Sequence, residues 1–489
     1  MNQQKTADSV PPSEIAITPE EWAQTPERVQ GFVLLLLQRV ETLETQVAAL
    51  QEQVNRNSQN SSQPPSSDGP EQETAKGSAQ QGSRKRGGQV GHAKHERALL
   101  PIEQVKEVVA VKPTMCRQCG HALCGEDESP LRHQVSEIPP VAAETIEYQL
   151  HRLACPHCQT TTCGQLPEGV PSGAFGPRLQ AMVALLSGRY HLSKRESCQL
   201  MDDFFQVELG LGTIAKLEQR TSEALAEPVE AAHGYVKTQK AIHLDETGWR
   251  EANDRAWLWV AVTQWVAVFL IHCSRSSRVA KQLLGSEVTA IVHSDRWSSY
   301  NWIPNHLRQL CWAHLKRDFQ AFAERDGPSA QLGDQLLEQL KLLFALWHSF
   351  QNDQITRPDF QRKSQPHRTK VGQLLRLGAE STHDKTAGTC RDILKREDAL
   401  WTFIDQEGVV PTNNFAEQQI RPAVLWRKSS FGTQSELGSR FVERLMTVVA
   451  SLKLQKRNVL DYLVEACQAA NSQTPPPSLI PVSLSDDTL

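Results

Sequence analysis

Two pairs of cysteines with the spacing Cys-x-x-Cys restrict the fold of this chain more than any other feature. The pairs are Cys116 with Cys119 and Cys155 with Cys158, and the 35 residues 120–154 separate them. This spacing lets two thiolates reach one tetrahedral ion, so the two pairs supply a closed set of four ligands. We therefore expect a zinc-finger module over residues 98–172 that holds one structural Zn²⁺, because four protein ligands leave no open position for catalysis.

The distribution of the cysteines argues against a disulfide framework. Six of the eleven lie between Cys116 and Cys163, and the others are scattered singly. The opening residues are polar and have no features of a secretory signal, so we expect a reducing, cytoplasmic environment in which clustered thiols indicate metal binding. The alternative is a set of unligated cysteines. One ligand could also be exchanged for a spare candidate: Cys124, Cys163, His121 or His157.

The N-terminal part has the heptad pattern of a coiled coil. Apolar residues recur at alternating steps of four and three from Val29 to Val54. This is an a/d seam, and we interpret residues 29–54 as a coiled coil through which copies of the chain associate. The alternative is an amphipathic helix that packs on the protein's own core. Residues 1–28 and 471–489 are predicted to be disordered tails.

Residues 55–97 are polar and of low complexity, which predicts a disordered linker. The linker contains a short basic arm that precedes a glycine pair. Such an arm binds a phosphate backbone or is simply solvated. The basic residues of the arm are Arg84, Lys85 and Arg86.

The segment 173–235 is predicted to be helical and to form a DNA-binding region. Ser193 and Glu196 have the spacing of a capping box that begins a helix ending near Phe205. A turn that contains Gly210 separates this helix from the next one. Two helices around such a turn are compatible with helix-turn-helix DNA binding and equally with an ordinary helical hairpin.

From residue 240 the apolar pattern changes to that of strands. We expect a multidomain α/β protein whose catalytic core is a ribonuclease-H-like mixed sheet, built from residues 236–325 and 411–470 around a helical insertion at 326–410. The first strand is predicted to end in Asp245 and the fourth in Asp295, at neighbouring strand ends. The five predicted strands are 241–244, 256–262, 266–271, 290–293 and 307–311.

Asp245 and Asp295 are candidate metal ligands because two adjoining carboxylates repel one another unless a cation lies between them. A pair of divalent ions held by oxygen ligands is the setting for in-line phosphoryl transfer, and a third carboxylate completes the shell. Our candidate is Glu417. Each acid also has an ordinary interpretation: Asp245 as a turn residue, Asp295 as a helix cap, and Glu417 as part of a capping box or an ion pair with Arg421.

Basic residues near these acids indicate a polyanionic partner. The net charge of −4 excludes a uniformly basic, histone-like binder but does not exclude local basic faces. Between Ile420 and Arg457 only Glu436 and Glu443 oppose a series of Lys and Arg side chains. The candidates for phosphate contacts are Lys316, Arg317, Arg421, Arg427 and Lys428.

Several motifs in one order give the chain its resemblance to a known family. They are the heptad segment ending in Asn60–Asp68, the Gly87–His92 arm, the paired cysteines, His243–Thr247, Cys311–His314, and Asn413–Glu417 running into Ile420–Pro422 and Arg427–Ser429. Together they resemble the transposases of the IS66 family of bacterial insertion sequences. One departure is that Arg296-Trp297 follows Asp295, where the resemblance leads us to expect glycine and an aromatic residue.

This resemblance implies a DDE transposase that cuts and joins double-stranded DNA at terminal inverted repeats and at target DNA. Two Mg²⁺ ions, or Mn²⁺, would be held by the triad Asp245, Asp295 and Glu417. It also implies a homo-oligomer in the cytoplasm, associated with the nucleoid when bound to DNA and not with a membrane, with small companion proteins from the same element. The zinc-finger ligands map to Cys116, Cys119, Cys155 and Cys158.

Two other functions compete with an active transposase. One is a catalytically inactive or domesticated DNA-binding protein derived from such an element, which the presence of all three acids disfavours. The other is a structure-specific nuclease or recombinase on the same fold, which would cut DNA without joining it.

Overall fold

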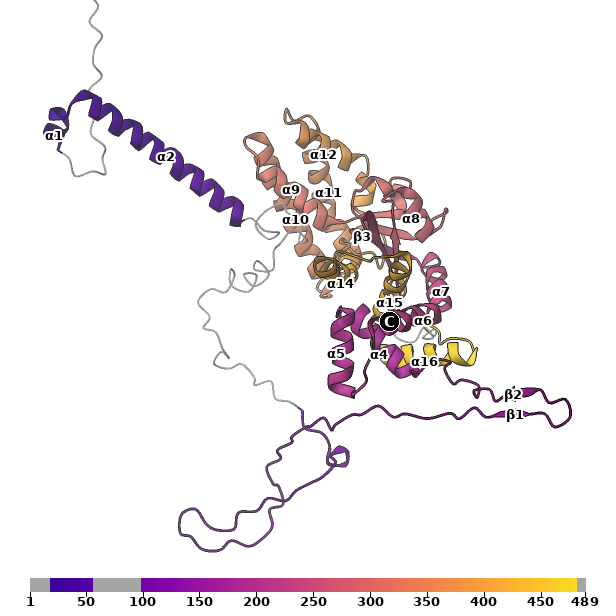
Figure 1. The fold of residues 1–489 in the computed structure, drawn as a ribbon. Coiled ribbons are helices and arrows are strands. Elements are labelled where there is room, and N and C mark those ends of the chain that lie inside the picture. Colours follow the sequence, from indigo (N-terminus) through magenta and orange to yellow (C-terminus); the bar gives the residue numbers. More distant parts are fainter. Residues whose placement is uncertain (1–17, 56–97, 482–489) are drawn as a thin grey trace, which may run out of the picture. The chain divides into compact units, whose positions relative to one another are not determined.

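The structure is a computed structural model that describes residues 18–55 and 98–481 (Figure 1). The basic arm of Arg84, Lys85 and Arg86 therefore lies outside the described residues. The chain divides into two compact units, which we describe separately. Unit 1 comprises residues 1–73, 243–245 and 288–417, and unit 2 comprises residues 74–242, 246–287 and 418–489.

The sheet that carries the candidate acids has five strands in the order β5-β4-β3-β6-β7. β4 and β5 are antiparallel, whereas β6 and β7 are parallel, so the sheet is mixed. β3 is longer than predicted, so Asp245 lies within the strand; the prediction that the strand ends there was wrong. The strands are β3 (Ala241–Glu251), β4 (Asp254–Val262), β5 (Ala267–His272), β6 (Ile291–Ser294) and β7 (Arg308–Leu310).

The helices of unit 1 that follow the sheet form a large apolar core. They are α9 (Trp312–Ala323), α10 (Pro328–Gln351), α11 (Arg357–Ala379), α12 (Asp384–Leu394) and α13 (Thr402–Asp405). The core contains fully buried aromatic side chains, and Trp312 at the start of α9 packs on Trp401 with ring centroids 5.2 Å apart. This packing fixes the first turn of α9, which carries two of the residues considered below.

Unit 2 combines helices with the outer strands of the sheet. Its helices are α4 (Pro177–Gly188), α5 (Lys194–Phe205), α6 (Leu211–Ala224), α7 (Ala226–Lys237), α8 (Ser277–Leu284), α15 (Glu436–Leu454) and α16 (Val459–Ser472). The capping box predicted at the start of α5 is present, because Ser193 and Glu196 each accept from the other's backbone N–H. α14 (Asn414–Ser430) begins in unit 1 and continues into unit 2.

Helix α15 covers the edge of the sheet at β5. Backbone N–H groups of β5 donate to three side chains on one face of this helix: Ser451 at 3.1 Å, Thr447 at 3.0 Å and Glu443 at 2.6 Å. An edge strand otherwise exposes unpaired N–H groups that can template aggregation. The polar row at four-residue spacing therefore closes the sheet on this side.

Both segments predicted to be disordered tails contain ordered structure. Helix α1 (Pro19–Gln24) has a capping box at Thr18, and its Trp22 is only 3% exposed. At the other end, the Tyr462 hydroxyl donates to the carbonyl of Pro477 at 2.8 Å, and Leu479 is buried. Local capping and a few apolar anchors therefore order the described parts of these segments, residues 18–28 and 471–481, despite their polar composition.

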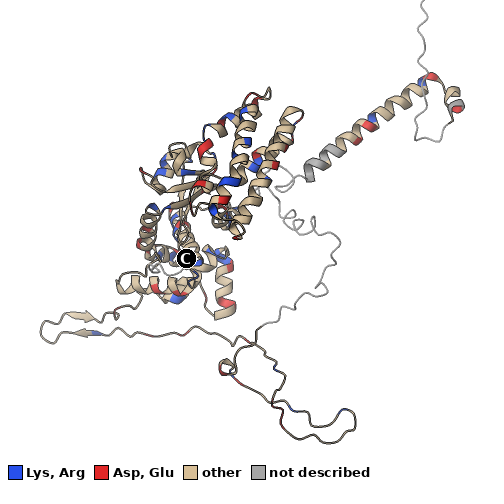
Figure 2. Ribbon diagram, turned by 180° about the vertical axis from the view of Figure 1, so that it is seen from behind, with Lys and Arg blue, Asp and Glu red and all other residues tan. Residues whose placement is uncertain are grey.

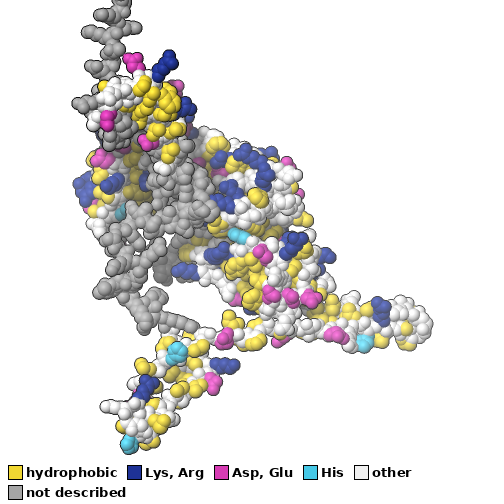
Figure 3. Space-filling view, turned by 60° about the vertical axis from the view of Figure 1, so that its left-hand side comes forward, with side chains coloured by type: hydrophobic (Ala, Val, Ile, Leu, Met, Phe, Trp, Pro, Cys, Tyr) yellow, Lys and Arg dark blue, Asp and Glu magenta, His cyan; other side chains and the backbone are white. Residues whose placement is uncertain are grey.

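Helix α2 (Glu27–Asn55) contains the heptad segment, and five of its heptad positions are exposed: Val29, Leu36, Val40, Leu43 and Val47. Figure 3 shows hydrophobic side chains uncovered on this helix. The coiled coil, and with it the association of copies of the chain, remains a prediction. Within the described segments, no helix combines the length and the apolarity needed to cross a membrane.

Candidate functional site

Two stacked histidines align the strands that carry the candidate acids. His243 on β3 lies over His293 on β6, with ring centroids 3.9 Å apart and planes 14° from parallel. Side chains two residues apart on a strand lie on the same face of the sheet. Asp245 follows His243 by two positions on β3, and Asp295 follows His293 by two positions just beyond β6. The two acids are thus at matching positions on neighbouring strands.

Asn413 connects the same strands one residue before the acids. Its amide Nδ2 donates to the carbonyl of Leu244 at 2.6 Å, and its backbone N–H donates to Cys311 Sγ at 3.1 Å. The backbone N–H of Cys311 in turn donates to the carbonyl of Ser294 at 3.0 Å. Asn413 also contacts His243, with Oδ1 3.1 Å from Nδ1. These bonds hold the start of α14 against the strands.

We expect Asn413→Ala to reduce DNA strand joining about 10- to 100-fold, the usual cost of losing a group that orients a metal ligand. The amide would no longer hold the first turn of α14 against the carbonyl next to Asp245. Joining of a labelled duplex measures the effect, and the exposed neighbour variant Asn414→Ala is the control. Equal activities for the two variants would contradict this positioning role.

Burial also sets the protonation of His243. Its pKa is lowered from 6.5 to about 4 by burial, which outweighs the hydrogen bond with Asn413. Between these pH values the unfolded chain binds a proton that the folded chain does not, so the free energy of unfolding decreases as pH falls, by about 3 kcal/mol in total. Urea unfolding at pH 7 and pH 5 should show about 2 kcal/mol of this loss, and His243→Gln should reduce it. The exposed-site variant His306→Gln should leave it unchanged.

Glu417 lies in the first turn of α14, within the influence of Asp295. Burial raises the pKa of Glu417, the charge of Asp295 adds to this effect, and the guanidinium of Arg317 opposes it. Since a raised pKa means that the carboxylate is poorly compensated, a bound cation would stabilise the charged form. All three predicted acids lie in unit 1, and Glu417 is close enough to Asp295 for their charges to interact.

His314 faces Glu417 from the first turn of α9. Its Nδ1 lies 3.6 Å from Glu417 Oε1, too far for a hydrogen bond. Burial, together with the charge of Arg317, lowers the pKa of His314 to about 4. The imidazole is therefore neutral at pH 7. One of its nitrogens can donate a hydrogen bond, and the other can accept one or bind a metal.

A cleft of about 430 Å³ opens beside Asp295 in unit 1. Asp295 Oδ1 accepts from the backbone N–H of Trp297 at 2.8 Å, while Arg308 on β7 donates to the carbonyl of Asp295 at 2.6 Å. These contacts hold Asp295 at the wall of the cleft, and Arg317 and His314 line the same cleft. Of the predicted phosphate contacts, Arg317 is thus next to the acids, and Lys316 is exposed on the same helix.

Arg296, the departure from the expected glycine, links three elements around the cleft. Its guanidinium lies 2.7 Å from a carboxylate oxygen of Asp318 on α9 and 2.7 Å from one of Asp392 on α12. Only 19% of the side chain is exposed. The residue therefore holds the loop after β6, and with it Asp295, against two helices.

We expect Arg296→Ala to lower the free energy of unfolding by about 3 kcal/mol, because it leaves the partly buried carboxylate of Asp318 without its cation, whereas Asp392 keeps its ion pair with Arg396. The control is Arg362→Ala, which removes an exposed pair with Asp359 and should cost about 0–1 kcal/mol. Urea denaturation measures both variants. Similar losses would show that the two pairs do not differ as their burial implies.

The predicted basic residues of unit 2 are not all available to a ligand. Arg427 donates from its guanidinium to the carbonyl of Gly248, and burial lowers its pKa. The Arg427 guanidinium therefore stabilises the structure of unit 2 through this hydrogen bond. Lys428 is exposed, and Arg421 is half-buried. Basic and acidic residues are interspersed over the helices, as Figure 2 shows.

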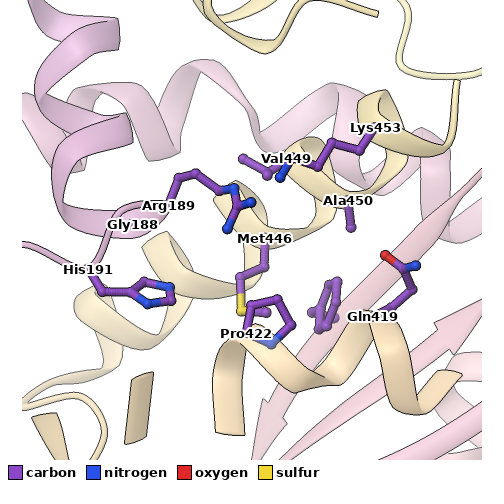
Figure 4. A pocket seen from close by; sticks show the side chains of 10 residues that line it. Gly188, Arg189, His191, Gln419, Pro422, Met446, Val449, Ala450 and Lys453 are labelled. Atoms are coloured by element: carbon purple, nitrogen blue, oxygen red, sulfur yellow. The ribbon is translucent and has the colours of Figure 1, made fainter. Parts of the chain in front are cut away.

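A small pocket in unit 2 contains cations that the sequence analysis missed. It has a volume of about 60 Å³ and is lined by Arg189 at the end of α4, His191, and Lys453 on α15 (Figure 4). The pKa of Lys453 is lowered by burial and by the charge of Arg189. The other side chains of the lining are mostly apolar, so the pocket is an apolar recess flanked by Arg189 and Lys453. They are 264 positions apart in the sequence, so no local pattern could have paired them.

The two cysteine pairs form identical turns. In each turn, the backbone N–H of the first cysteine donates to the carbonyl of the residue five positions later. Its own carbonyl accepts from the backbone N–H of the residue four positions later. That fourth residue has positive φ in both cases, +73° at Gly120 and +58° at Gln159. Hydrogen bonds from its own turn, mainly from the Cys119 backbone, lower the pKa of Cys116, which favours the metal-binding thiolate. Within the described segments, the four sulfurs are not gathered around one position.

Comparison with known proteins identifies the family. The family profile described as "Transposase IS66 family" matches residues 172–440 of the 489-residue chain. The chain belongs to this family. A second profile, "zinc-finger binding domain of transposase IS66", matches residues 113–159 and includes all four predicted ligands. Residues 9–98 match a family of unknown function.

Membership in the IS66 family implies an enzyme of DNA transposition with a zinc-finger module. The chain is also similar to an uncharacterized protein, y4qI, of Sinorhizobium fredii (strain NBRC 101917 / NGR234). The two are 24% identical over 408 residues, which cover 74% of this chain and 71% of the relative. The family predicted from the sequence motifs is therefore confirmed.

Proposed function

We propose that this IS66 transposase has a ribonuclease-H-like core and acts by a DDE two-metal mechanism. The strand order β5-β4-β3-β6-β7 is the order expected for that core, with the first strand central and the fourth beside it. The observation that carries the proposal is the alignment of Asp245 with Asp295 through the stacked His243 and His293. Glu417, whose pKa responds to Asp295, supplies the third carboxylate.

The donor set fits hard divalent cations such as Mg²⁺ or Mn²⁺. Three carboxylates from β3, the end of β6 and α14 offer oxygen ligands, and no cationic side chain neutralises Glu417 enough to lower its pKa. When bound, a metal pair stabilises the attacking and leaving oxygens of an in-line displacement at phosphorus. Asp245, Asp295 and Glu417 would hold the ions. Asn413 and Arg308 would keep these acids in position.

The chain needs no protein nucleophile, because water and then a DNA 3′-hydroxyl attack phosphorus in turn. Arg317 in the cleft is suited to a phosphate near the acids, and Lys316, Arg421 and Lys428 to phosphates further along the duplex. The arm of Arg84, Lys85 and Arg86 and the zinc-finger module would bind terminal inverted repeats.

We further propose that the active form is a homo-oligomer. Two element ends must be held together for joining, and the exposed apolar positions of α2 supply a self-complementary surface. Companion proteins of the same element belong to this proposal as well, on the ground of family membership alone.

Strand transfer tests the proposed function. The purified full-length chain would be incubated with a labelled duplex that carries the element's end, an unlabelled target, and Mg²⁺ or Mn²⁺. Joined products support the transposase. Cleavage without joining would indicate a nuclease, and tight end binding without cleavage would indicate a binding-only protein; either would overturn the proposal.

A further inference from the structure

Three metal-ligating atoms meet at the junction of α9 and α14 in unit 1. They belong to Cys311, His314 and Glu417, and all lie within 4.8 Å of one another. Elsewhere in residues 18–55 and 98–481, no other three side chains of His, Cys, Asp or Glu come together in this way. The group shares Glu417 with the acidic triad but adds a sulfur and a nitrogen, so its chemistry differs from that of the triad.

Two of these atoms are buried without a hydrogen-bond partner. His314 Nδ1 and Glu417 Oε1 are both inaccessible to solvent and form no hydrogen bond, although they face one another at 3.6 Å. A buried polar atom left unpaired destabilises the folded state. Since both atoms are good metal ligands, an ion between them would satisfy both at once.

The local backbone places the cysteine and the histidine on one side of α9. Cys311 is the N-cap of the helix, and the backbone N–H of His314 donates to its carbonyl at 3.1 Å. Residues three positions apart in a helical turn are neighbours on its surface. The backbone N–H of Asn413 donates to Cys311 Sγ at 3.1 Å. Burial outweighs this contact and raises the pKa of the Cys311 thiol to about 11, so a bound metal has to displace the thiol proton.

The separation of His314 from Glu417 fits a tetrahedral ion of the zinc class. With bonds of about 2.3 Å to sulfur and 2.0–2.1 Å to nitrogen or oxygen, the ligand atoms of such an ion lie roughly 3.3–3.6 Å apart. The His314–Glu417 separation of 3.6 Å agrees with this. A thiolate with an imidazole selects Zn²⁺ and similar metals over Mg²⁺, which prefers oxygen ligands.

We propose that Cys311, His314 and Glu417 form a binding site for a thiophilic transition metal, separate from the four-cysteine zinc site. Three protein ligands leave one coordination position open for water or a phosphate oxygen. An ion bound here draws Glu417 Oε1 away from the acidic triad. Zinc-class metals therefore inhibit the Mg²⁺-dependent reaction; this consequence rests on the proposed function, whereas metal binding does not.

Cobalt titration tests the binding site. Co²⁺ bound to thiolate gives a sulfur-to-metal charge-transfer absorption that Co²⁺ on carboxylates lacks. The metal-free full-length chain should show two thiolate-bound Co²⁺ equivalents, and Cys311→Ala should show one. The control is Cys467→Ala, which removes another buried thiol whose polar neighbours are Gln180 and Thr221, and should retain two.

His314→Ala provides an independent check, since it keeps the thiol and should weaken the second Co²⁺ equivalent at least about 10-fold. Circular dichroism and urea unfolding verify that the variants fold. Two full equivalents in both Cys311→Ala and His314→Ala would overturn the site, as would a loss in Cys467→Ala as large as that in Cys311→Ala.

Inhibition is measured separately. Strand transfer in Mg²⁺ should fall when Zn²⁺ is added beyond the equivalent taken up by the four-cysteine site, and the ratio of activities with and without Zn²⁺ should be closer to one in Cys311→Ala. An equal ratio in the two proteins would overturn the inhibitory role. If the chain joins no DNA under any condition, the proposed function fails while the cobalt result still decides the binding site.

Discussion

Asp245→Asn should reduce strand joining by more than about 100-fold while leaving binding of the element's end unchanged. An amide of the same shape keeps the strand and its packing but removes the negative charge that holds a divalent cation. Loss of an outer partner of a metal ligand already costs about 10- to 100-fold, so loss of a ligand itself should exceed that range. Joined product per unit time and a filter-binding Kd are the two measurements.

The matched control is Asp254→Asn, which makes the same change at the exposed start of β4. It should join DNA at the rate of the unmutated protein. Activity of Asp245→Asn within a few-fold of this control would show that the acid is not a ligand. Loss of end binding in Asp245→Asn would instead point to a folding defect.

Glu417→Gln and Asp295→Asn should each give a loss as large as that of Asp245→Asn. Groups that act as one unit are strongly non-additive, so a double variant should be little worse than either single variant. Losses that multiply in the double variant would indicate that the acids act independently, which a shared metal pair does not allow.

The strands could be predicted from the sequence because short apolar runs rich in β-branched residues are a local signal, and β4 and β5 are indeed buried over most of their length. The position of Asp245 within β3 could not, since the residues after it are partly polar and do not alternate clearly. Their pairing in the sheet extends the strand to Glu251. Tertiary contact thus decided a boundary that the local pattern left open.

The supporting contacts of the site were beyond sequence reasoning for a different reason. Asn413 and Leu244 are separated by 169 positions, and the hydrogen bond between them follows from the fold. Cys311 and His314 were noticed as a motif, but their relation to Glu417 depends on how α9 and α14 meet. The role of Arg296 likewise became clear only from the positions of Asp318 and Asp392.

The turns at the two cysteine pairs, in contrast, could be predicted from the local sequence alone. Each turn is local and follows from its own sequence, including the positive φ at Gly120 and Gln159. Bringing the two turns together requires the energy of metal binding, because residues 98–165 bury few side chains of their own. A module with so little apolar core depends on its ion for order.

Cys155→Ser should therefore release the structural zinc and disorder the module. Zinc binding contributes roughly 10–16 kcal/mol of apparent free energy in zinc-finger peptides, far more than a segment with a small core supplies by itself. We expect residues 98–172 to become sensitive to protease and affinity for the element's end to fall at least about 100-fold. Zinc retained per chain against a competing chelator measures the first effect directly.

Cys163→Ser is the control for Cys155→Ser, because it changes an exposed cysteine on the same hairpin, β1 (Arg152–Ala154) with β2 (Thr161–Cys163). It should retain zinc, protease resistance and end binding. Loss of zinc in Cys163→Ser, with retention in Cys155→Ser, would mean that the spare cysteine is the ligand. Chelation of the unmutated chain should reproduce the Cys155→Ser phenotype and be reversed by Zn²⁺, since binding and folding of the module are one equilibrium.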